Sequence, residues 1–309
     1  MNYPKRVKIV EVGPRDGLQN EKTTVDIDTK VALINRLSEA GLSTIEAGSF
    51  VSPKWVPQMA GSDQVFSQLP KHTATTYTAL TPNIQGLERA IACGVREVAV
   101  FAAASESFSQ KNINCSIAES IERFKPLAEK ALANDLRVRG YISCVVGCPY
   151  EGTVDIESAT AVANQLLGMG CYEVSLGDTV GTGTPATIEL LLNRLLVDIP
   201  ASKLAVHLHD TYGQALANVL RALQMGISVI DSSVAGLGGC PYAEGASGNL
   251  ATEDLVYLLD GLGIDHGVDL TKLIAAGNPR FFSLVITLTT DSNGSEKSSN
   301  ANLVRSLLP

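Results

Sequence analysis

The stretch Leu204-Ala205-Val206-His207-Leu208-His209-Asp210 holds two of the chain's four histidines. Aliphatic residues alternate with the others, which is the period of a β-strand. Such a strand would pack its aliphatic face against helices and project both imidazoles from its other face. Neighbouring imidazoles repel each other once both are protonated, so the pair is stable when neutral, hydrogen-bonded or bound to a metal. Histidines satisfied by backbone or carboxylate groups are the alternative that this motif alone leaves open.

Four other places share one local pattern, in which a glycine and an apolar residue precede two variable residues and a β-rich run. The pattern occurs at 41–46, 94–98, 170–174 and 226–230. Each glycine follows a helical-looking stretch, so we expect it to be the left-handed residue that ends a helix before a strand. Further strands are predicted at 7–12, 73–80, 138–146 and 204–209.

The segments between these strands have helical periodicity, as in the apolar face formed by Leu216, Val219, Leu220 and Leu223. Eight strand-then-helix units in 309 residues predict a (β/α)8 TIM barrel with its active site at the carboxyl ends of the strands. A doubly wound sheet is the alternative. No linker divides the chain, so we expect a catalytic barrel domain over 1–280. The C-terminal extension over 281–309 is partly Ser/Asn-rich, which is typical of a surface loop or a disordered tail.

Composition restricts the class of protein. The formal net charge is −8, which argues against nucleic acid or an anionic membrane as a partner. No apolar run approaches the roughly 20 residues that span a bilayer, and the N-terminus lacks a targeting pattern, so we expect a cytoplasmic protein. The six cysteines contain no C-x-x-C pair; they are Cys93, Cys115, Cys144, Cys148, Cys171 and Cys240. We therefore expect their thiols to be reduced and expect no structural zinc site.

Polar residues follow the ends of several predicted strands, where a barrel places its site. The first strand runs into Gly13-Pro14-Arg15-Asp16-Gly17-Leu18-Gln19-Asn20. We expect Asp16 to converge with His207 and His209 at the barrel mouth. A carboxylate with two imidazoles and open positions is a divalent-metal site, and ligand type alone permits Zn²⁺, Mn²⁺, Mg²⁺ or Fe²⁺. The absence of a thiolate favours Mg²⁺ or Mn²⁺.

Arg15 has two interpretations. It can be the structural ion-pair partner of a carboxylate, or it can stabilise an enolate or carboxylate oxygen beside the metal. Glu46, on the second predicted strand, is expected to be a buried acid that pairs with Arg15 and helps to position it.

Cys240 lies between Gly238-Gly239 and Pro241, in a loop rather than in a helix or strand. Glycines there allow a flap that closes over substrate, whereas an ordinary loop thiol is the alternative. The stretch lacks both G-x-G-x-x-G and G-x-x-x-x-G-K-[ST], so it does not predict a nucleotide-phosphate loop.

Three motifs carry a resemblance that covers Val7 to about Gly277. They are 13–20, His207-Leu208-His209-Asp210-Thr211-Tyr212-Gly213 and Ser233-Val234-Ala235-Gly236-Leu237-Gly238-Gly239-Cys240-Pro241-Tyr242. With these motifs the chain resembles the 3-hydroxy-3-methylglutaryl-coenzyme A (HMG-CoA) lyase family, whose members are metal-dependent (β/α)8 enzymes. Related isopropylmalate and homocitrate synthases share Arg-Asp-Gly and His-x-His but continue with an acidic residue and glutamine. Leu18-Gln19-Asn20 follows here, as in the lyases.

The resemblance implies that a divalent cation is held by Asp16, His207, His209 and Asn249. It implies that Arg15 stabilises the enolate and, with Gln19, contacts substrate. It also implies that Cys240 transfers a proton from the closing loop. Glu46 and Asp178 match acidic positions of the family's active site.

Two departures from the family are expected: Glu244 stands where glutamine is frequent, and the tail beyond Pro279 does not resemble the endings of the family.

The implied reaction is retro-Claisen cleavage of (S)-3-hydroxy-3-methylglutaryl-CoA to acetyl-CoA and acetoacetate, as in leucine degradation and ketone-body metabolism. The implied partner is an acyl-CoA thioester, and we expect a homo-oligomer, a dimer. One alternative is a lyase for a larger 3-hydroxy-3-substituted glutaryl-CoA. The others are a 2-oxo acid synthase or aldolase and a catalytically silent metal-binding barrel.

Overall fold

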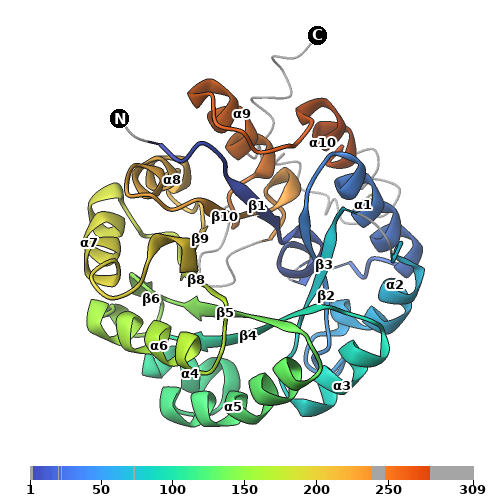
Figure 1. The fold of residues 1–309 in the computed structure, drawn as a ribbon, viewed down its shortest axis with the longest axis horizontal. Coiled ribbons are helices and arrows are strands. Elements are labelled where there is room, and N and C mark those ends of the chain that lie inside the picture. Colours follow the sequence, from blue (N-terminus) through green and yellow to red (C-terminus); the bar gives the residue numbers. More distant parts are fainter. Residues whose placement is uncertain (1–2, 20, 22, 72–73, 239–247, 279–309) are drawn as a thin grey trace, which may run out of the picture.

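The computed structural model describes residues 3–19, 21, 23–71, 74–238 and 248–278. In this part of the chain eight parallel strands close into a barrel in the order β1-β10-β9-β8-β5-β4-β3-β2 (Figure 1). Closure through the pairing of β1 with β10 confirms the predicted TIM barrel and excludes a doubly wound sheet. The barrel strands are β1 Lys8–Glu11, β2 Thr44–Ser49, β3 Thr76–Leu80, β4 Glu97–Ala103, β5 Arg137–Ser143, β8 Glu173–Asp178, β9 Leu204–Leu208 and β10 Val229–Ser232.

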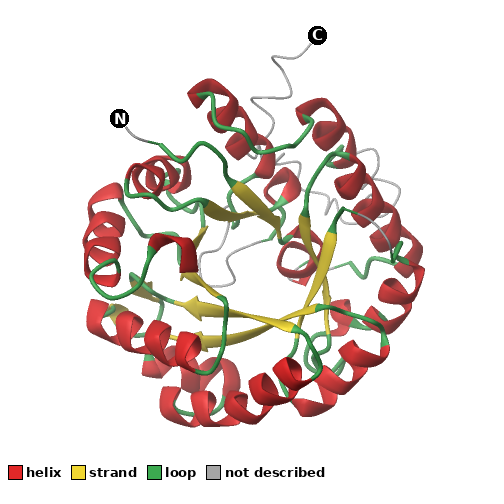
Figure 2. Ribbon diagram, viewed as in Figure 1, coloured by secondary structure: helices red, strands yellow, loops and turns green. Residues whose placement is uncertain are grey.

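Helices surround this barrel on the outside, with the strands enclosed by their ring (Figure 2). They are α1 Ile27–Glu39, α2 Ser62–Gln68, α3 Ile84–Ala92, α4 Glu106–Ile113, α5 Ile117–Ala133, α6 Ile156–Gly168, α7 Pro185–Leu195, α8 Ala215–Gln224, α9 Thr252–Leu262 and α10 Leu270–Ala276. A short antiparallel pair, β6 Gly147–Cys148 and β7 Gly152–Thr153, follows β5 and was not expected from the sequence. None of the described helices is long and apolar enough to cross a bilayer.

The four glycines that were predicted to end helices all have a left-handed backbone. Gly41, Gly94, Gly170 and Gly226 have φ values of +97°, +77°, +100° and +91° and follow α1, α3, α6 and α8. A side chain on this backbone is strained, and at Gly41 it would also collide with the backbone of Gly267. The repeated pattern therefore identified real helix ends.

Strand ends differ from the prediction where a local backbone feature intervenes. The predicted strand 138–146 stops at Ser143, because Cys144 turns the chain with a φ of +59°. The strand that carries the histidines stops at Leu208, and His209 forms an isolated bridge with Asn249.

The alternation of the histidine stretch is confirmed. Leu204, Val206 and Leu208 belong to the large apolar core shared with the helices, whereas Ala205 packs in a separate cluster with residues of β1 and β10. The imidazoles are consequently on the inner side of the barrel. The described cysteines, at 93, 115, 144, 148 and 171, are free thiols, as expected.

The predicted boundary at residue 280 and the extension 281–309 lie outside the described residues, as do Cys240 and Glu244.

Candidate active site and metal centre

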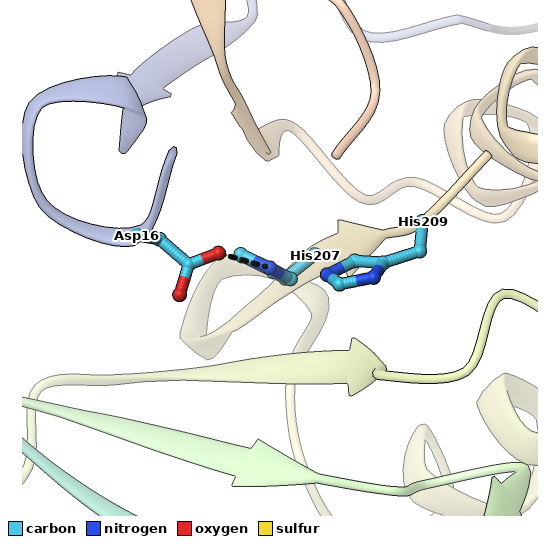
Figure 3. A group of neighbouring side chains, drawn as sticks. All are labelled: Asp16, His207 and His209. Atoms are coloured by element: carbon cyan, nitrogen blue, oxygen red, sulfur yellow. Dashed lines mark ion pairs between the residues drawn. The ribbon is translucent and has the colours of Figure 1, made fainter. Parts of the chain in front are cut away.

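Asp16, His207 and His209 come together at the barrel mouth, as the sequence predicted. Each offers a ligand atom, and these atoms lie within 4.8 Å of one another. Figure 3 shows the carboxylate of Asp16, from the turn after β1, facing the imidazoles of the β9 segment. Nε2 of His207 is 3.7 Å from Oδ2 of Asp16. The ring centroids of His207 and His209 are 5.4 Å apart. Three potential ligands thus converge from two strands that are neighbours of β10.

The protonation states of His209 and Asp16 suit a cation. Burial lowers the pKa of His209 to about 4, so its ring is neutral, and its buried Nδ1 has no hydrogen-bond partner among the described residues. Burial alone would raise the pKa of Asp16, but Arg15, the two imidazoles and the hydrogen bond from Asn249 together outweigh it and hold that pKa well below its usual range. An anionic carboxylate beside a neutral imidazole is a donor set that a divalent cation accepts.

Asn249 lies against the same carboxylate. Its Nδ2 donates to Oδ2 of Asp16 over 2.9 Å and to the Leu237 carbonyl over 3.1 Å. The bridge between Asn249 and His209 holds this residue beside the end of β9. The structure therefore brings the fourth ligand that the resemblance implies next to the other three.

Asp231 on β10 orients His207, and the sequence reading missed it. Its Oδ2 lies 3.3 Å from Nδ1 of His207, and Arg139 and the Ser175 hydroxyl donate to the same carboxylate. Burial alone would raise the pKa of Asp231, but Arg139 and His207 together outweigh it and hold that pKa well below the usual range. Because the carboxylate is ionised, it accepts the Nδ1–H of His207 and leaves Nε2 directed at Asp16.

A chain of buried charges continues from Asp231 through the barrel interior. Nε of Arg139 is 2.8 Å from Glu173, which in turn pairs with Lys8 at 3.0 Å. These residues occupy positions on β1, β5 and β8 and fix the carboxylate that holds His207.

Arg15 and Glu46 pair as the sequence predicted. Nε of Arg15 is 2.6 Å from Oε2 of Glu46, and its Nη1 is 2.6 Å from Oδ1 of Asp16. Glu46 is fully buried on β2, and burial raises its pKa although Arg15 acts against that shift. The pair holds the guanidinium at the edge of the metal cluster.

One cleft of about 970 Å³ contains Arg15, Asp16, His207 and His209 on its wall. Much of the rest of the lining comes from α4, α5 and the segment that joins them. It combines apolar side chains with polar and cationic ones, namely Phe101, Phe108, Ile113, Phe124, Lys111, Asn112, Asn114 and Arg123. The cleft is large enough for a substrate much longer than a small keto acid.

A family model described as HMGL-like matches residues 6–279 of this chain. The chain belongs to the HMGL-like family. It is 57% identical over 300 residues to "3-hydroxy-3-methylglutaryl-CoA lyase, cytoplasmic" of Mus musculus. The aligned region covers 97% of this chain and 87% of the mouse protein. Mitochondrial lyases are matched as well.

Solved structures agree with this membership of the HMGL-like family. A crystal structure of hydroxymethylglutaryl-CoA lyase from Pseudomonas aeruginosa has a TM-score of 0.92 and 55% identity, covering 99% of both chains. An HMG-CoA lyase from "Acenitobacter baumannii", in complex with coenzyme A and 3-methylmalate, has a TM-score of 0.87 and 34% identity. That match covers 96% of this chain and 95% of the other.

Asp178 ends β8, and the charge of His207 acts on its carboxylate in this HMGL-like chain. It pairs in register with Leu208, whose side chain faces the helices, so its own side chain leaves the barrel on that side. Its carboxylate accepts the backbone N–H groups of Gly181, Thr182 and Gly183 over 3.1, 3.2 and 2.8 Å. These three hydrogen bonds show that Asp178 shapes the loop after β8, and its part in the reaction stays a prediction.

Gln19 lines the cleft three residues after Asp16, where it can meet a substrate.

We expect Asp231→Asn to weaken cation binding by roughly 10- to 100-fold, because Nδ1 of His207 loses its charged acceptor. Ser175→Ala is the matched control, since it removes one donor to Asp231 over 2.7 Å but keeps the carboxylate. Activity titrated against Mg²⁺ concentration measures the effect. A half-saturating concentration that is unchanged in Asp231→Asn, or shifted equally in Ser175→Ala, would show that Asp231 does not act through His207.

Proposed function

We propose that this chain is a divalent-metal-dependent HMG-CoA lyase, which converts 3-hydroxy-3-methylglutaryl-CoA to acetyl-CoA and acetoacetate. The observation that carries the proposal is the convergence of Arg15 with Asp16, His207 and His209 on one cleft. The lyase names of relatives above half identity support the same reaction.

The metal ligands in this proposal are Asp16, His207, His209 and Asn249. Bound there, Mg²⁺ or Mn²⁺ supplies a Lewis acid for substrate oxygens. The ligands offer oxygen and imidazole nitrogen and no thiolate, which is the support for these two ions over softer ones. Asp231 and Glu46 act as positioning residues, the first for His207 and the second for Arg15.

The proposed reaction breaks the bond between C2 and C3 of the substrate after the C3 hydroxyl gives its proton to a base, for which Asp16 is the carboxylate on the described wall of the cleft. The electron pair of that bond passes to C2 and is delocalised onto the thioester oxygen as an enolate, while C3 becomes the ketone of acetoacetate. Arg15 donates to the enolate oxygen, and Cys240 gives its proton to C2. The burial of Arg15 supports this role, because the attraction between a guanidinium and a negatively charged oxygen is stronger where water is excluded.

An acyl-CoA thioester is the proposed substrate class because the cleft is large and its lining includes both apolar and cationic side chains. The side chains of Lys111 and Arg123 suit phosphate groups, and the phenylalanines suit the pantetheine arm.

Further proposals are a cytoplasmic location, a homodimer, and a role in leucine degradation or ketone-body metabolism. The first is supported by the name of the mouse relative. Residues 1–280 are proposed as the catalytic domain, with 281–309 as an extension.

The experiment that tests the substrate compares kcat/KM of the purified chain on HMG-CoA and on a glutaryl-CoA with a larger substituent at C3. We expect HMG-CoA to be preferred by 10-fold or more, since each misplaced methylene in a fitted pocket costs about 1–3 kcal/mol. Preference for the larger thioester would replace the proposed substrate. Cleavage of neither would contradict the proposed reaction.

A further inference from the structure

Glu11 is the last residue of β1, and its side chain is fully buried. None of the described Lys, Arg or His residues forms an ion pair with it. Burial raises the pKa of this carboxyl group to about 7. A buried acid without a cation partner is costly compared with an apolar side chain, so stability alone does not explain a glutamate at this position.

Two turns meet at the barrel mouth above this residue, after the paired strands β1 and β10 (Figure 1). The turn Gly13–Gly17, the Asp16 turn, follows β1 and carries a ligand of the proposed cation site. The turn 233–238, the Leu237 turn, follows β10. Asn249, another proposed ligand, donates to the Leu237 carbonyl over 3.1 Å. The position of each turn therefore affects one ligand of the cation.

The carboxyl group of Glu11 joins the two turns. Its Oε1 accepts the N–H of Gly13 over 2.8 Å and the N–H of Val234 over 2.9 Å. Its Oε2 accepts the hydroxyl of Thr252, the first residue of α9, over 2.7 Å. One oxygen atom thus holds a backbone N–H of the Asp16 turn and a backbone N–H of the Leu237 turn.

The Asp16 turn transmits the position of its first residue to the ligand. The carbonyl of Val12 accepts the N–H groups of Arg15, Asp16 and Gly17 over 3.1, 2.7 and 3.2 Å. These bonds make the turn a compact unit, so a shift of Gly13 also shifts the carboxylate of Asp16.

The two turns also pack directly on each other. A Cβ atom on Gly17 would lie 2.8 Å from Cβ of Leu237 and 2.8 Å from Oγ of Ser233. A Cβ atom on Gly238 would lie 3.3 Å from Cα of Gly17. Carbon atoms without a bond between them pack at about 3.5–4.0 Å, so a larger residue at position 17 would push the turns apart.

We propose that Glu11 is a positioning residue, which holds the Asp16 turn and the Leu237 turn in the one arrangement that the cation site needs. The inference rests on the proposed function, since that function supplies the cation and the reaction. It adds a residue that acts through Gly13 and Val234 and makes no contact of its own with the cation or the substrate.

Glu11→Met tests the proposal, because methionine fills the space but does not replace the carboxylate as an acceptor. The Kd for Mn²⁺, measured by calorimetry without substrate, should rise about 10-fold or more. The kcat for HMG-CoA at saturating Mn²⁺ should fall on the order of 10²-fold, since Arg15 and Asp16 are displaced together. Both are measured well below the melting temperature of each variant.

Glu11→Gln should keep Kd and kcat within about 3-fold of the wild type, because the amide oxygen still accepts both N–H groups. The amide nitrogen can donate to Thr252, whose hydroxyl then turns to Ser232 at 2.9 Å. Glu97→Met is the matched control. Glu97 is a buried glutamate at the opposite end of the barrel, where it accepts the Tyr172 hydroxyl over 2.7 Å. Its loss should lower the melting temperature without changing Kd or kcat.

Gly17→Ala tests the contact between the turns without changing Glu11, and it decides the matter if Glu11→Met does not fold. It should raise the Kd for Mn²⁺ and lower kcat, as in Glu11→Met. Gly168→Ala is its control, because an added Cβ there, at the end of α6, meets nothing within 4 Å.

The outcomes separate this inference from the proposed function. If the wild type bound Mn²⁺ and both Glu11→Met and Gly17→Ala kept its Kd and kcat, the positioning role would be overturned while the metal centre stands. Equal losses in Glu11→Gln and Glu11→Met would also overturn it, because the charge rather than the acceptor would then matter. If the wild type bound no divalent cation, the proposed function itself would fail.

Discussion

Arg15→Gln is expected to lower kcat for thioester cleavage by about 10²- to 10³-fold, the usual effect of removing one donor to a developing oxyanion. The guanidinium stands 2.6 Å from both Asp16 and Glu46, so it is fixed before substrate arrives. Such pre-organisation is the reason for a large effect on kcat rather than on substrate binding. Steady-state kinetics at saturating Mg²⁺ measure it.

The substitution has a second consequence that needs its own control. Glu46 is fully buried, and without Arg15 its carboxylate has lost its cation, which destabilises the fold. Glu46→Gln added to Arg15→Gln removes that charge. The double variant should recover thermal stability and cation affinity but keep the low kcat. Recovery of kcat in the double variant would mean that Arg15 serves only as the ion-pair partner of Glu46.

Cys240→Ser is expected to lower kcat by about 10²- to 10⁴-fold, the range for loss of a general acid. A thiol with a pKa near 8.5 is mostly protonated at neutral pH and can give its proton to a carbanionic carbon. Serine has nearly the same size but is a far weaker acid, so the exchange changes the chemistry more than the packing. Wild-type turnover in Cys240→Ser would make the thiol a bystander.

Thiol reagents give an independent reading of Cys240. Among the described cysteines only Cys93 is partly exposed, and burial raises the pKa of Cys171 to about 12. Cys93→Ser is therefore the matched control. Reagent should inactivate the wild type and Cys93→Ser at the same rate, with protection by bound substrate. If the reagent failed to inactivate Cys93→Ser, the reactive thiol would be Cys93 rather than Cys240.

Local sequence was enough to predict the barrel and the core of the metal cluster. The left-handed glycines, such as Gly41 and Gly94, mark helix ends through their own backbone conformation and need no tertiary information. The period of two in β9 fixed the side on which His207 and His209 project. Asp16 could join them because the carboxyl ends of all barrel strands meet at one mouth.

The supports of the site were not predictable in the same way. Asp231, Arg139 and Glu173 are single polar residues on three strands, and only barrel closure brings them into one buried network. The alternation of side chains along β5 and β8 could indicate which charged residues point into the barrel, but it does not reveal which of them form ion pairs. Asp178 ends β8 in register with Leu208 and binds the backbone of the loop that follows, which the sequence pattern alone did not predict.

Product analysis with and without the cation tests the central claim most directly. The purified chain is given HMG-CoA, and acetyl-CoA and acetoacetate are quantified before chelation, after removal of the divalent cation and after addition of Mg²⁺ or Mn²⁺. The convergence of Asp16, His207 and His209 predicts equimolar products, no turnover in the metal-free protein, and recovery on addition of the ion. Full turnover in the metal-free protein, or products other than these two, would contradict the account.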